Sequence, residues 1–273
     1  KDNTDGFFIA RMYKKYKNLR IIIYIYFRRE FIMTNIFGLN LTELTSLITD
    51  LNLPKFRAKQ IIEWLYQKHA TSFDEMTNLS KDLREKLAQE FTIERAKSCD
   101  RLDSSDGKTT KFLLEFGDGI GVETVLMRQP YGNSICVSSQ AGCNMGCSFC
   151  ASTLHGMARN LSTGEILAQA MFIQELLNQT GEQINNIVIM GSGEPMLNYD
   201  NVLNFIRLVH EPYCLNLGYR NITISTSGIV PGINKLAQEN LPITLSISLH
   251  APNNELRTEL MPINKTLSYR RSH

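Results

Sequence analysis

Four of the chain's six cysteines fall in one short stretch, at Cys136, Cys143, Cys147 and Cys150. The last three follow the pattern C-x3-C-x2-C, which lets one loop place three thiolates around a single inorganic centre. Structural zinc normally takes four protein ligands, and the next candidate along the chain is His155. A Cys3His zinc site is therefore one interpretation. A 4Fe–4S cluster fits the spacing better, because three thiolates leave one iron open to bind a substrate.

The residues after position 132 alternate between strand-like and helix-like segments. Four strand-like runs are rich in β-branched residues: "SICVSS", "INNIVIMG", "NITISTSG" and "ITLSISLH". Helical sequences separate these runs, and the first helix opens with a capping box from Ser162 to Glu165. This order predicts an α/β protein with a parallel sheet buried on both faces, in a barrel or a doubly wound arrangement.

Polar segments end three of these strands. They are "MGSGEPMLN" at 190–198, "ISTSG" at 224–228 and "SLH" at 248–250. Ligand sites of parallel α/β folds open at the carboxyl ends of the strands. Gly193 permits a close approach of the backbone, and Glu194 supplies an acceptor for an ammonium group. We therefore expect these strand ends to line one site beside the cysteine loop.

The sequence before residue 133 predicts three further parts. Residues 33–97 predict a small helical domain, with helices in "LTELTSLITDL", "PKFRAKQIIEWLYQKH" and "SKDLREKLAQEF". Residues 98–132 predict a β-hairpin connector, because two β-like runs flank the turn "GDGIG". Residues 1–32 are basic and contain a short apolar run. We interpret them as a non-native extension upstream of Met33, and the alternative is an anchor at a membrane surface.

The composition narrows the class of protein. At 273 residues and 43% hydrophobic content, the chain can bury a sizeable core. Clustered cysteines in such a length are typical of metal binding in a reducing compartment rather than of a secreted disulfide scaffold. The sequence shows neither a membrane-spanning run nor a signal-peptide cleavage site, so we expect a cytoplasmic location. Outside residues 1–32 the chain carries 21 basic and 24 acidic residues, so RNA contacts must come from local patches.

The cysteine loop, with Phe149 before its last cysteine, resembles the radical S-adenosylmethionine (SAM) superfamily. Longer motifs narrow the resemblance: "CVSSQAGCNMGCSFC", "GEILAQ", "GSGEPMLNYDNV", "ISTSGIVPGI" and "SLHAPN…R…LMPINK". From about residue 36 to residue 265 the chain resembles the RlmN/Cfr group of adenine methyltransferases, and Pro195 in "GEP" favours the RlmN branch. The resemblance implies a radical SAM (β/α)6 barrel, of which residues 133–266 supply about four βα units, with an N-terminal helical accessory domain and a short β-hairpin connector.

The resemblance also implies roles for individual residues. The ligands of the 4Fe–4S cluster are Cys143, Cys147 and Cys150. The SAM-binding residues are Gly193, Glu194, Ser225, Ser248, Leu249 and His250. Two residues are catalytic: Cys136, which resolves a protein–RNA thioether, and Glu123, which accepts a proton. Without the resemblance, Cys136 is read as a buried strand cysteine and Glu123 as an outward-facing carboxylate. Cys99 and Cys214 match no functional position of the group.

The group's activity would make the chain a methyltransferase. In that activity SAM and the cluster give a 5′-deoxyadenosyl radical, and a methyl group passes through a cysteine to carbon 2 of an adenine in 23S rRNA and tRNA. The resemblance further implies a reductant such as flavodoxin, no membrane and a monomer. Two alternatives stay open. One is methylation at adenine carbon 8, as in the Cfr branch, and the other is a non-catalytic Fe–S or zinc module that binds RNA.

The chain departs from the group's pattern after "MPINKT". Residues 267–273, "LSYRRSH", are interpreted as an aberrant tail of a truncated barrel. The group's methyl-carrying cysteine lies further along the sequence, beyond this point. We therefore expect this chain to hold the cluster, and SAM weakly, without methylating RNA.

Overall fold

The computed structural model describes residues 33–266, so the interpretations of residues 1–32 and 267–273 concern segments outside the described residues. A seven-stranded sheet has the strand order β11-β10-β9-β6-β5-β4-β3. Its strands are β3 (Lys97–Asp103), β4 (Thr109–Glu115), β5 (Gly121–Gln129), β6 (Gly132–Val137), β9 (Ile184–Ile189), β10 (Ile222–Thr226) and β11 (Thr244–Ile247). Among the described helices, none is long and apolar enough to cross a membrane.

The sheet changes from antiparallel to parallel at β6. Strands β3 to β6 pair antiparallel, whereas β6, β9, β10 and β11 pair parallel. The four parallel strands coincide with the four predicted strand runs. The antiparallel strands extend the same sheet, so the segment predicted as a hairpin connector is continuous with the parallel part. It also contains β3, which the sequence pattern did not indicate. Every residue of β3 is exposed.

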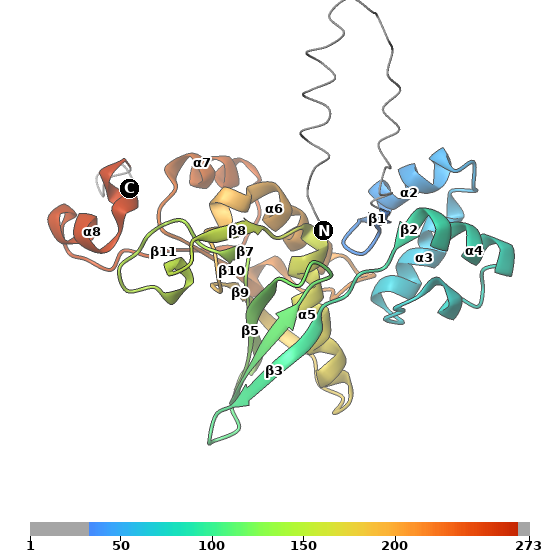
Figure 1. The fold of residues 1–273 in the computed structure, drawn as a ribbon, viewed down its shortest axis with the longest axis horizontal. Helices are drawn as coiled ribbons and strands as arrows, with labels where there is room; N and C mark the ends of the chain where they lie inside the picture. Colours follow the sequence, from blue (N-terminus) through green and yellow to red (C-terminus); the bar gives the residue numbers. More distant parts are fainter. Residues whose placement is uncertain (1–32, 267–273) are drawn as a thin grey trace, which may run out of the picture. The chain divides into compact units, whose positions relative to one another are not determined.

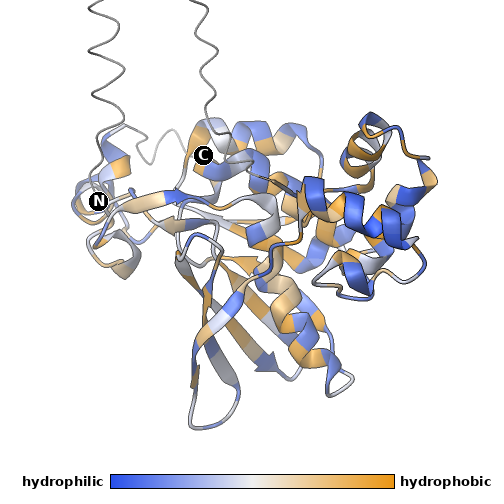
Figure 2. Ribbon diagram, turned by 45° about the vertical axis from the view of Figure 1, so that its right-hand side comes forward, coloured by the Kyte–Doolittle hydropathy of each residue, from blue (hydrophilic) through white to orange (hydrophobic). Residues whose placement is uncertain are grey.

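Helices connect the parallel strands. The three crossovers are α5 (Thr163–Asn178), α6 (Tyr199–His210) and α7 (Val230–Gln238), and α8 (Asn254–Leu260) follows β11 (Figure 1). The predicted capping box begins α5. The Ser162 hydroxyl accepts a hydrogen bond from the Glu165 N–H at 3.2 Å, and the Glu165 carboxylate accepts one from the Ser162 N–H at 2.8 Å. Hydrophobic and hydrophilic residues alternate along the helices and strands (Figure 2).

Helices cover one face of the parallel strands. Alternate strand residues such as Ile135, Ile187 and Ile224 are buried in a single core with residues of α5 and α6. The residues between them, including Cys136 and Ser225, lie on the opposite face and are half-buried. The prediction that both faces are buried is therefore wrong for residues 33–266, because small and polar side chains on the second face remain accessible there.

The N-terminal residues form a helical domain closed by a two-stranded parallel pair. Its elements are β1 (Thr34–Asn35), α2 (Leu41–Asp50), α3 (Phe56–Tyr66), the 3-10 turn η1 (Phe73–Glu75), α4 (Lys81–Glu90) and β2 (Phe91–Thr92). The three α-helices coincide with the three predicted helices. Leu44 and Ile48 of α2 are fully buried, whereas Leu47 and the C-cap residue Leu51 are only partly buried.

Two glycines allow the segment between β1 and α2 to pack on the start of α5. A Cβ atom added to Gly38 would lie 2.4 Å from the Gly164 Cα, and one added to Gly164 would lie 2.2 Å from the Phe37 carbonyl oxygen. Tyr66 fixes the same segment, because its hydroxyl accepts a hydrogen bond from the Gly38 N–H at 3.0 Å and donates one to the Leu39 carbonyl at 2.7 Å. The helical domain and α5 are thus in direct backbone contact.

Candidate metal centre

The loop that carries the three clustered cysteines is closed by a small antiparallel ribbon. This ribbon pairs β7 (Gln140–Gly142) with β8 (Met157–Asn160). At its base the Cys143 N–H donates to the Gly156 carbonyl at 3.1 Å. Gly142 has a φ of 78°, and an added Cβ would lie 2.0 Å from that same carbonyl oxygen. Only glycine fits there, so the backbone itself sets where the loop begins.

The loop brings three free thiols close enough together for their charges to interact. Cys143 and Cys147 are buried, and Cys150 is half-buried. Burial raises the pKa of the Cys143 thiol, and Cys150 raises it further. The pKa of Cys147 is raised by burial first and then by Cys143 and Cys150. A thiol whose ionisation is opposed in this way needs a positive partner before it becomes a thiolate, and a bound metal centre is such a partner.

The donor set fits an iron–sulfur centre. Three sulfurs from one loop are the ligands that such a cluster takes when one of its irons is left open. His155, the fourth ligand of the zinc interpretation, is exposed.

Gly193 brings the loop after β9 against the cysteine loop. It has a φ of 99°, and an added Cβ would lie 2.5 Å from the Cβ of Gln140. The Gln140 side-chain oxygen accepts a hydrogen bond from the Glu194 N–H at 2.8 Å. The backbone N–H of Gly193 also reaches the sulfur of Cys143 and lowers its pKa, against the larger effect of burial. Gly193 therefore packs closely on β7, and its predicted contact with SAM stays a prediction.

The carboxylate of Glu194 is buried and fully hydrogen-bonded by the protein. One oxygen accepts from the Met196 N–H at 3.0 Å and the Thr226 hydroxyl at 2.7 Å. The other accepts from the Ser227 N–H at 2.7 Å and the Ser227 hydroxyl at 2.8 Å. A carboxylate offers about four lone-pair sites, so protein donors account for all of them. Glu194 joins the ends of β9 and β10, and its predicted contact with an ammonium group stays a prediction.

The remaining predicted SAM contacts lie at the ends of β10 and β11. The hydroxyl oxygens of Ser225 and Ser248 are 3.2 Å apart. Leu249 is 37% exposed, and His250 adopts a φ of 55°. The His250 ring lies 4.5 Å from the ring of Phe149 in the cysteine loop. The structure thus brings the third predicted strand end beside the cysteines, as the parallel sheet required.

The two residues predicted to be catalytic share the half-buried face of the sheet. Cys136 on β6 is directly opposite Val125 on β5, and Glu123 is two residues from Val125 on the same strand, hence on the same face. The Glu123 carboxylate is 60% exposed and lies 2.7 Å from the Lys111 ammonium. Burial raises the pKa of Cys136, which a hydrogen bond from the Met190 backbone partly offsets. Cys136 is therefore a neutral thiol near pH 7, separate from the cysteine loop.

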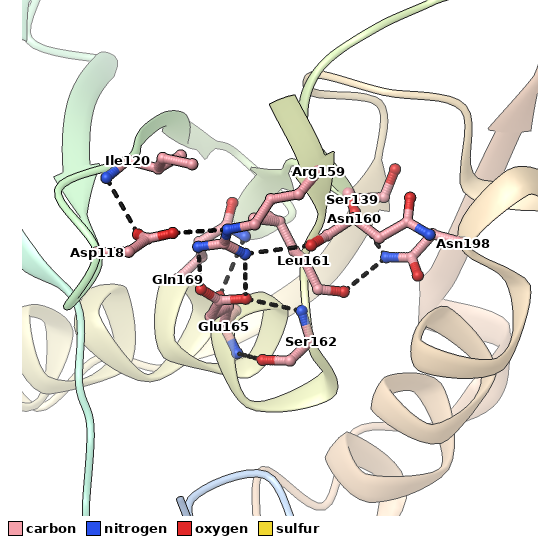
Figure 3. Close-up of polar contacts among 10 residues, drawn as sticks. All are labelled: Asp118, Ile120, Ser139, Arg159, Asn160, Leu161, Ser162, Glu165, Gln169 and Asn198. Atoms are coloured by element: carbon pink, nitrogen blue, oxygen red, sulfur yellow. Dashed lines mark hydrogen bonds and ion pairs between the residues drawn. The ribbon is translucent and has the colours of Figure 1, made fainter. Parts of the chain in front are cut away.

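Arg159, which the sequence pattern did not single out, holds β8, the strand that follows the cysteine loop. Arg159 on β8 donates from Nε to Asp118 at 2.7 Å (Figure 3). Its Nη1 and Nη2 atoms donate to the two carboxylate oxygens of Glu165 at 2.8 and 2.6 Å, a bidentate pair. Nothing local in the sequence connects residue 118 with residue 159, so this contact could not be predicted.

Two buried amides hold the end of β6. Asn198 donates to the carbonyls of Ser139 and Leu161, both at 2.7 Å (Figure 3). Gln169 accepts from the Ser138 N–H at 2.8 Å and donates to the Ser138 carbonyl at 3.0 Å. These amides form hydrogen bonds with backbone groups that lie beyond the end of the strand. Buried peptide groups require such partners. Asn198 lies in the motif "GSGEPMLNYDNV" and Gln169 in "GEILAQ". Membership of these motifs is the only sign in the sequence that the two amides have a specific role.

Comparisons with known proteins agree with this geometry. Residues 34–93 match the family described as ribosomal RNA large subunit methyltransferase N-terminal domain, and residues 137–272 match the radical SAM superfamily. A crystal structure of a radical SAM methyltransferase from Sphaerobacter thermophilus aligns with a TM-score of 0.82 and 40% identity, covering 87% of this chain and 70% of that one.

Curated relatives are similar over most of this chain. "Probable dual-specificity RNA methyltransferase RlmN" of Symbiobacterium thermophilum is 55% identical over 227 residues, which are 83% of this chain and 61% of the relative. The protein of the same name from Bacillus cytotoxicus is 51% identical over 231 residues, 85% of this chain and 64% of the relative. The chain therefore spans less than two thirds of the length of these relatives.

An α/β sheet with a three-cysteine loop beside its strand ends, matched by these comparisons, defines a protein of the radical SAM superfamily. The helical domain narrows that class further. The chain belongs to the RlmN/Cfr group of that superfamily and is of the RlmN type. The resemblance inferred from the motifs is thereby confirmed.

Proposed function

We propose that this chain is the cluster-binding and SAM-binding part of an enzyme that methylates carbon 2 of an adenine in 23S rRNA and in tRNA. The observation that carries the proposal is the convergence of three thiols and three strand-end segments at one edge of the sheet. In this proposal the four parallel strands belong to a (β/α)6 barrel, and residues 34–93 serve as its accessory domain.

The chain's own residues would have distinct roles. Cys143, Cys147 and Cys150 would hold a 4Fe–4S cluster. Gly193 and Glu194 would shape the SAM pocket, together with the residues at the ends of β10 and β11: Ser225, Ser248, Leu249 and His250. When bound, the cluster and SAM supply one-electron chemistry that amino-acid side chains cannot perform. An electron donor such as flavodoxin would reduce the cluster, and we propose that the protein is a monomer.

Cys136 and Glu123 would act on the RNA rather than on the cluster. Cys136 is a neutral thiol on the face that the helices leave open, at the same end of the sheet as Glu123. Such a thiol becomes a nucleophile only after it loses its proton. The proposed role of Glu123 is to accept a proton from the adenine, and its exposure leaves the carboxylate accessible to a large substrate.

Anaerobic reconstitution of the chain with iron and sulfide tests the metal centre. We expect a brown protein that dithionite bleaches and that converts SAM to 5′-deoxyadenosine. Cys147→Ala should lose iron, whereas Cys136→Ala and the exposed control Cys99→Ala should keep it. A colourless protein with one bound zinc would refute the proposal and favour the zinc module.

Nucleoside mass spectrometry tests the substrate and the position. The chain is incubated with SAM, a reductant and 23S rRNA or tRNA, and the digested RNA is searched for 2-methyladenosine and 8-methyladenosine. With a version of the protein that also carries the group's methyl-carrying cysteine, the 2-methyl product would support the proposal and the 8-methyl product would favour the alternative activity of the Cfr branch. The expectation that these 273 residues do not methylate RNA by themselves predicts that 5′-deoxyadenosine forms without either product.

A further inference from the structure

Arg257 on α8 is a fully buried cation whose hydrogen-bond partners are all neutral. The side chain is 1% exposed. Its Nη1 donates to the Asn264 side-chain oxygen at 2.6 Å, and its Nη2 donates to the Ser227 carbonyl at 2.5 Å and the Ser248 carbonyl at 3.4 Å. Its Nε atom is buried without a hydrogen-bond partner. Among the described residues, no carboxylate forms an ion pair with Arg257.

A buried guanidinium in this state requires an anion. Taking a cation out of water is costly, and neutral carbonyls and amides return only part of that cost. Glu194 is a buried acid at the neighbouring strand ends, but its carboxylate is occupied by Thr226, Ser227 and Met196. Burial lowers the pKa of Arg257, and among the described residues the acidic group that opposes this shift is the thiol of Cys147. An ionised Cys147 would therefore supply the negative charge that the partners of Arg257 lack.

The segment that carries Arg257 also packs on the cysteine loop. The Ser148 N–H, next to Cys147, donates to the carbonyl of Leu260 at the end of α8 at 2.9 Å. A Cβ added to Gly146, on the other side of Cys147, would lie 3.6 Å from the Pro262 Cγ. Arg257 joins this segment to the ends of β10 and β11 through Ser227 and Ser248. Its charge is thus held in a fixed place beside the middle cysteine.

We propose that Arg257 is a positioning residue that supplies the compensating positive charge for the thiolate centre and thereby raises its reduction potential. The proposal rests on the cluster assigned under the proposed function. Three thiolates bring three negative charges to a partly buried site, and reduction adds one more. A fixed cation nearby stabilises the reduced form more than the oxidised form, because the attraction grows with the negative charge.

The test compares three variants of the 273-residue chain after anaerobic reconstitution. Arg257→Gln removes the charge, Arg257→Lys keeps it, and Arg207→Gln removes the charge of an arginine that is half-exposed and paired with Glu239. Iron and sulfide content are measured first. The midpoint potential of the cluster is then measured by EPR-monitored redox titration without SAM, so the readout does not depend on activity.

We expect Arg257→Gln to shift the midpoint to a more negative potential, with Arg257→Lys closer to the wild type and Arg207→Gln unchanged. Equal midpoints in the wild type and Arg257→Gln would overturn the proposal, as would equal shifts in the Gln and Lys variants. Where Arg257→Gln does not fold, Arg257→Lys decides: retained iron at the wild-type midpoint supports the proposal, and loss of the cluster refutes it. A wild-type chain without iron would instead refute the cluster itself.

Discussion

Both oxygens of Glu194 are anchored by the end of β10, and Ser227 supplies two of the four donors through its N–H and its hydroxyl. These bonds join two strands whose loops flank the cysteines. The four donors occupy the acceptor sites of this buried carboxylate in place of the water that burial removes. Glu194 of the "GEP" motif therefore links the ends of two strands through these hydrogen bonds.

Glu194→Gln should destabilise the fold. The amide NH2 would face the Ser227 N–H or the Thr226 hydroxyl, so at least one buried donor would lose its acceptor. Leaving such a group unsatisfied costs about 1–3 kcal/mol. Urea unfolding measures the change, and Glu182→Gln on the surface should stay within about 0.5 kcal/mol of the wild type. An unchanged urea midpoint for Glu194→Gln would mean that the hydrogen bonds of the carboxylate do not stabilise the fold.

The sequence predicted the parts of this site that follow from local pattern. Cysteine spacing indicated the loop, strand periodicity indicated the parallel sheet, and the polar strand ends indicated which segments meet. Ser162 caps α5 as its local pattern predicted. These predictions hold because each depends on residues close together in the chain.

Contacts between distant residues were beyond sequence reasoning. Arg159 pairs with Asp118 across 41 positions, and Arg257 reaches Ser227 across 30. Charge alone does not identify the partner of such an arginine, because most arginines are solvated at the surface. The half-buried second face of the sheet was missed for a related reason. A run of β-branched residues indicates a strand, but it does not say whether another layer covers each side.

Gly164→Ala should destabilise the contact between the helical domain and α5. Alanine gains up to about 1 kcal/mol over glycine inside a helix. Here its methyl group would lie 2.2 Å from the Phe37 carbonyl oxygen, and overpacking of this kind costs about 1–3 kcal/mol. We therefore expect a net loss in the free energy of unfolding. Gly218→Ala is the matched control, since the nearest atom to its added Cβ is 3.9 Å away. Stabilisation by Gly164→Ala would contradict the packing described.

Arg159→Lys should weaken the attachment of β8 even though the positive charge is kept. A single ammonium cannot replace the two-pronged contact with Glu165 and also reach Asp118. The site is partly exposed, so we expect a loss of about 1 kcal/mol, near the upper end for surface pairs. That corresponds to a decrease in Tm of about 2–4 °C for a domain of this size. Arg207→Lys, which loses a single contact with Glu239, should change Tm less, and an equal effect of both would argue against the bidentate geometry.

Cys214 should make the protein less stable at alkaline pH. Burial raises the pKa of its thiol to about 12, with a smaller contribution from Glu211. The folded state therefore keeps the proton while the unfolded thiol, with a pKa near 9, releases it. Stability from this group is fully present below about pH 9 and is lost as pH rises toward 12, by about 1.4 kcal/mol per pH unit.

The comparison of the wild type with Cys214→Ala removes the titration of Cys214 together with the part of the raised pKa of Tyr66 and Tyr213 that Cys214 causes. The free energy of unfolding is measured by urea denaturation of the reduced apoprotein from pH 7 to pH 11. We expect the stability advantage of the wild type over the variant to shrink as pH rises above 9. Parallel curves over the whole range would show that the Cys214 thiol ionises as readily in the folded protein as in the unfolded chain.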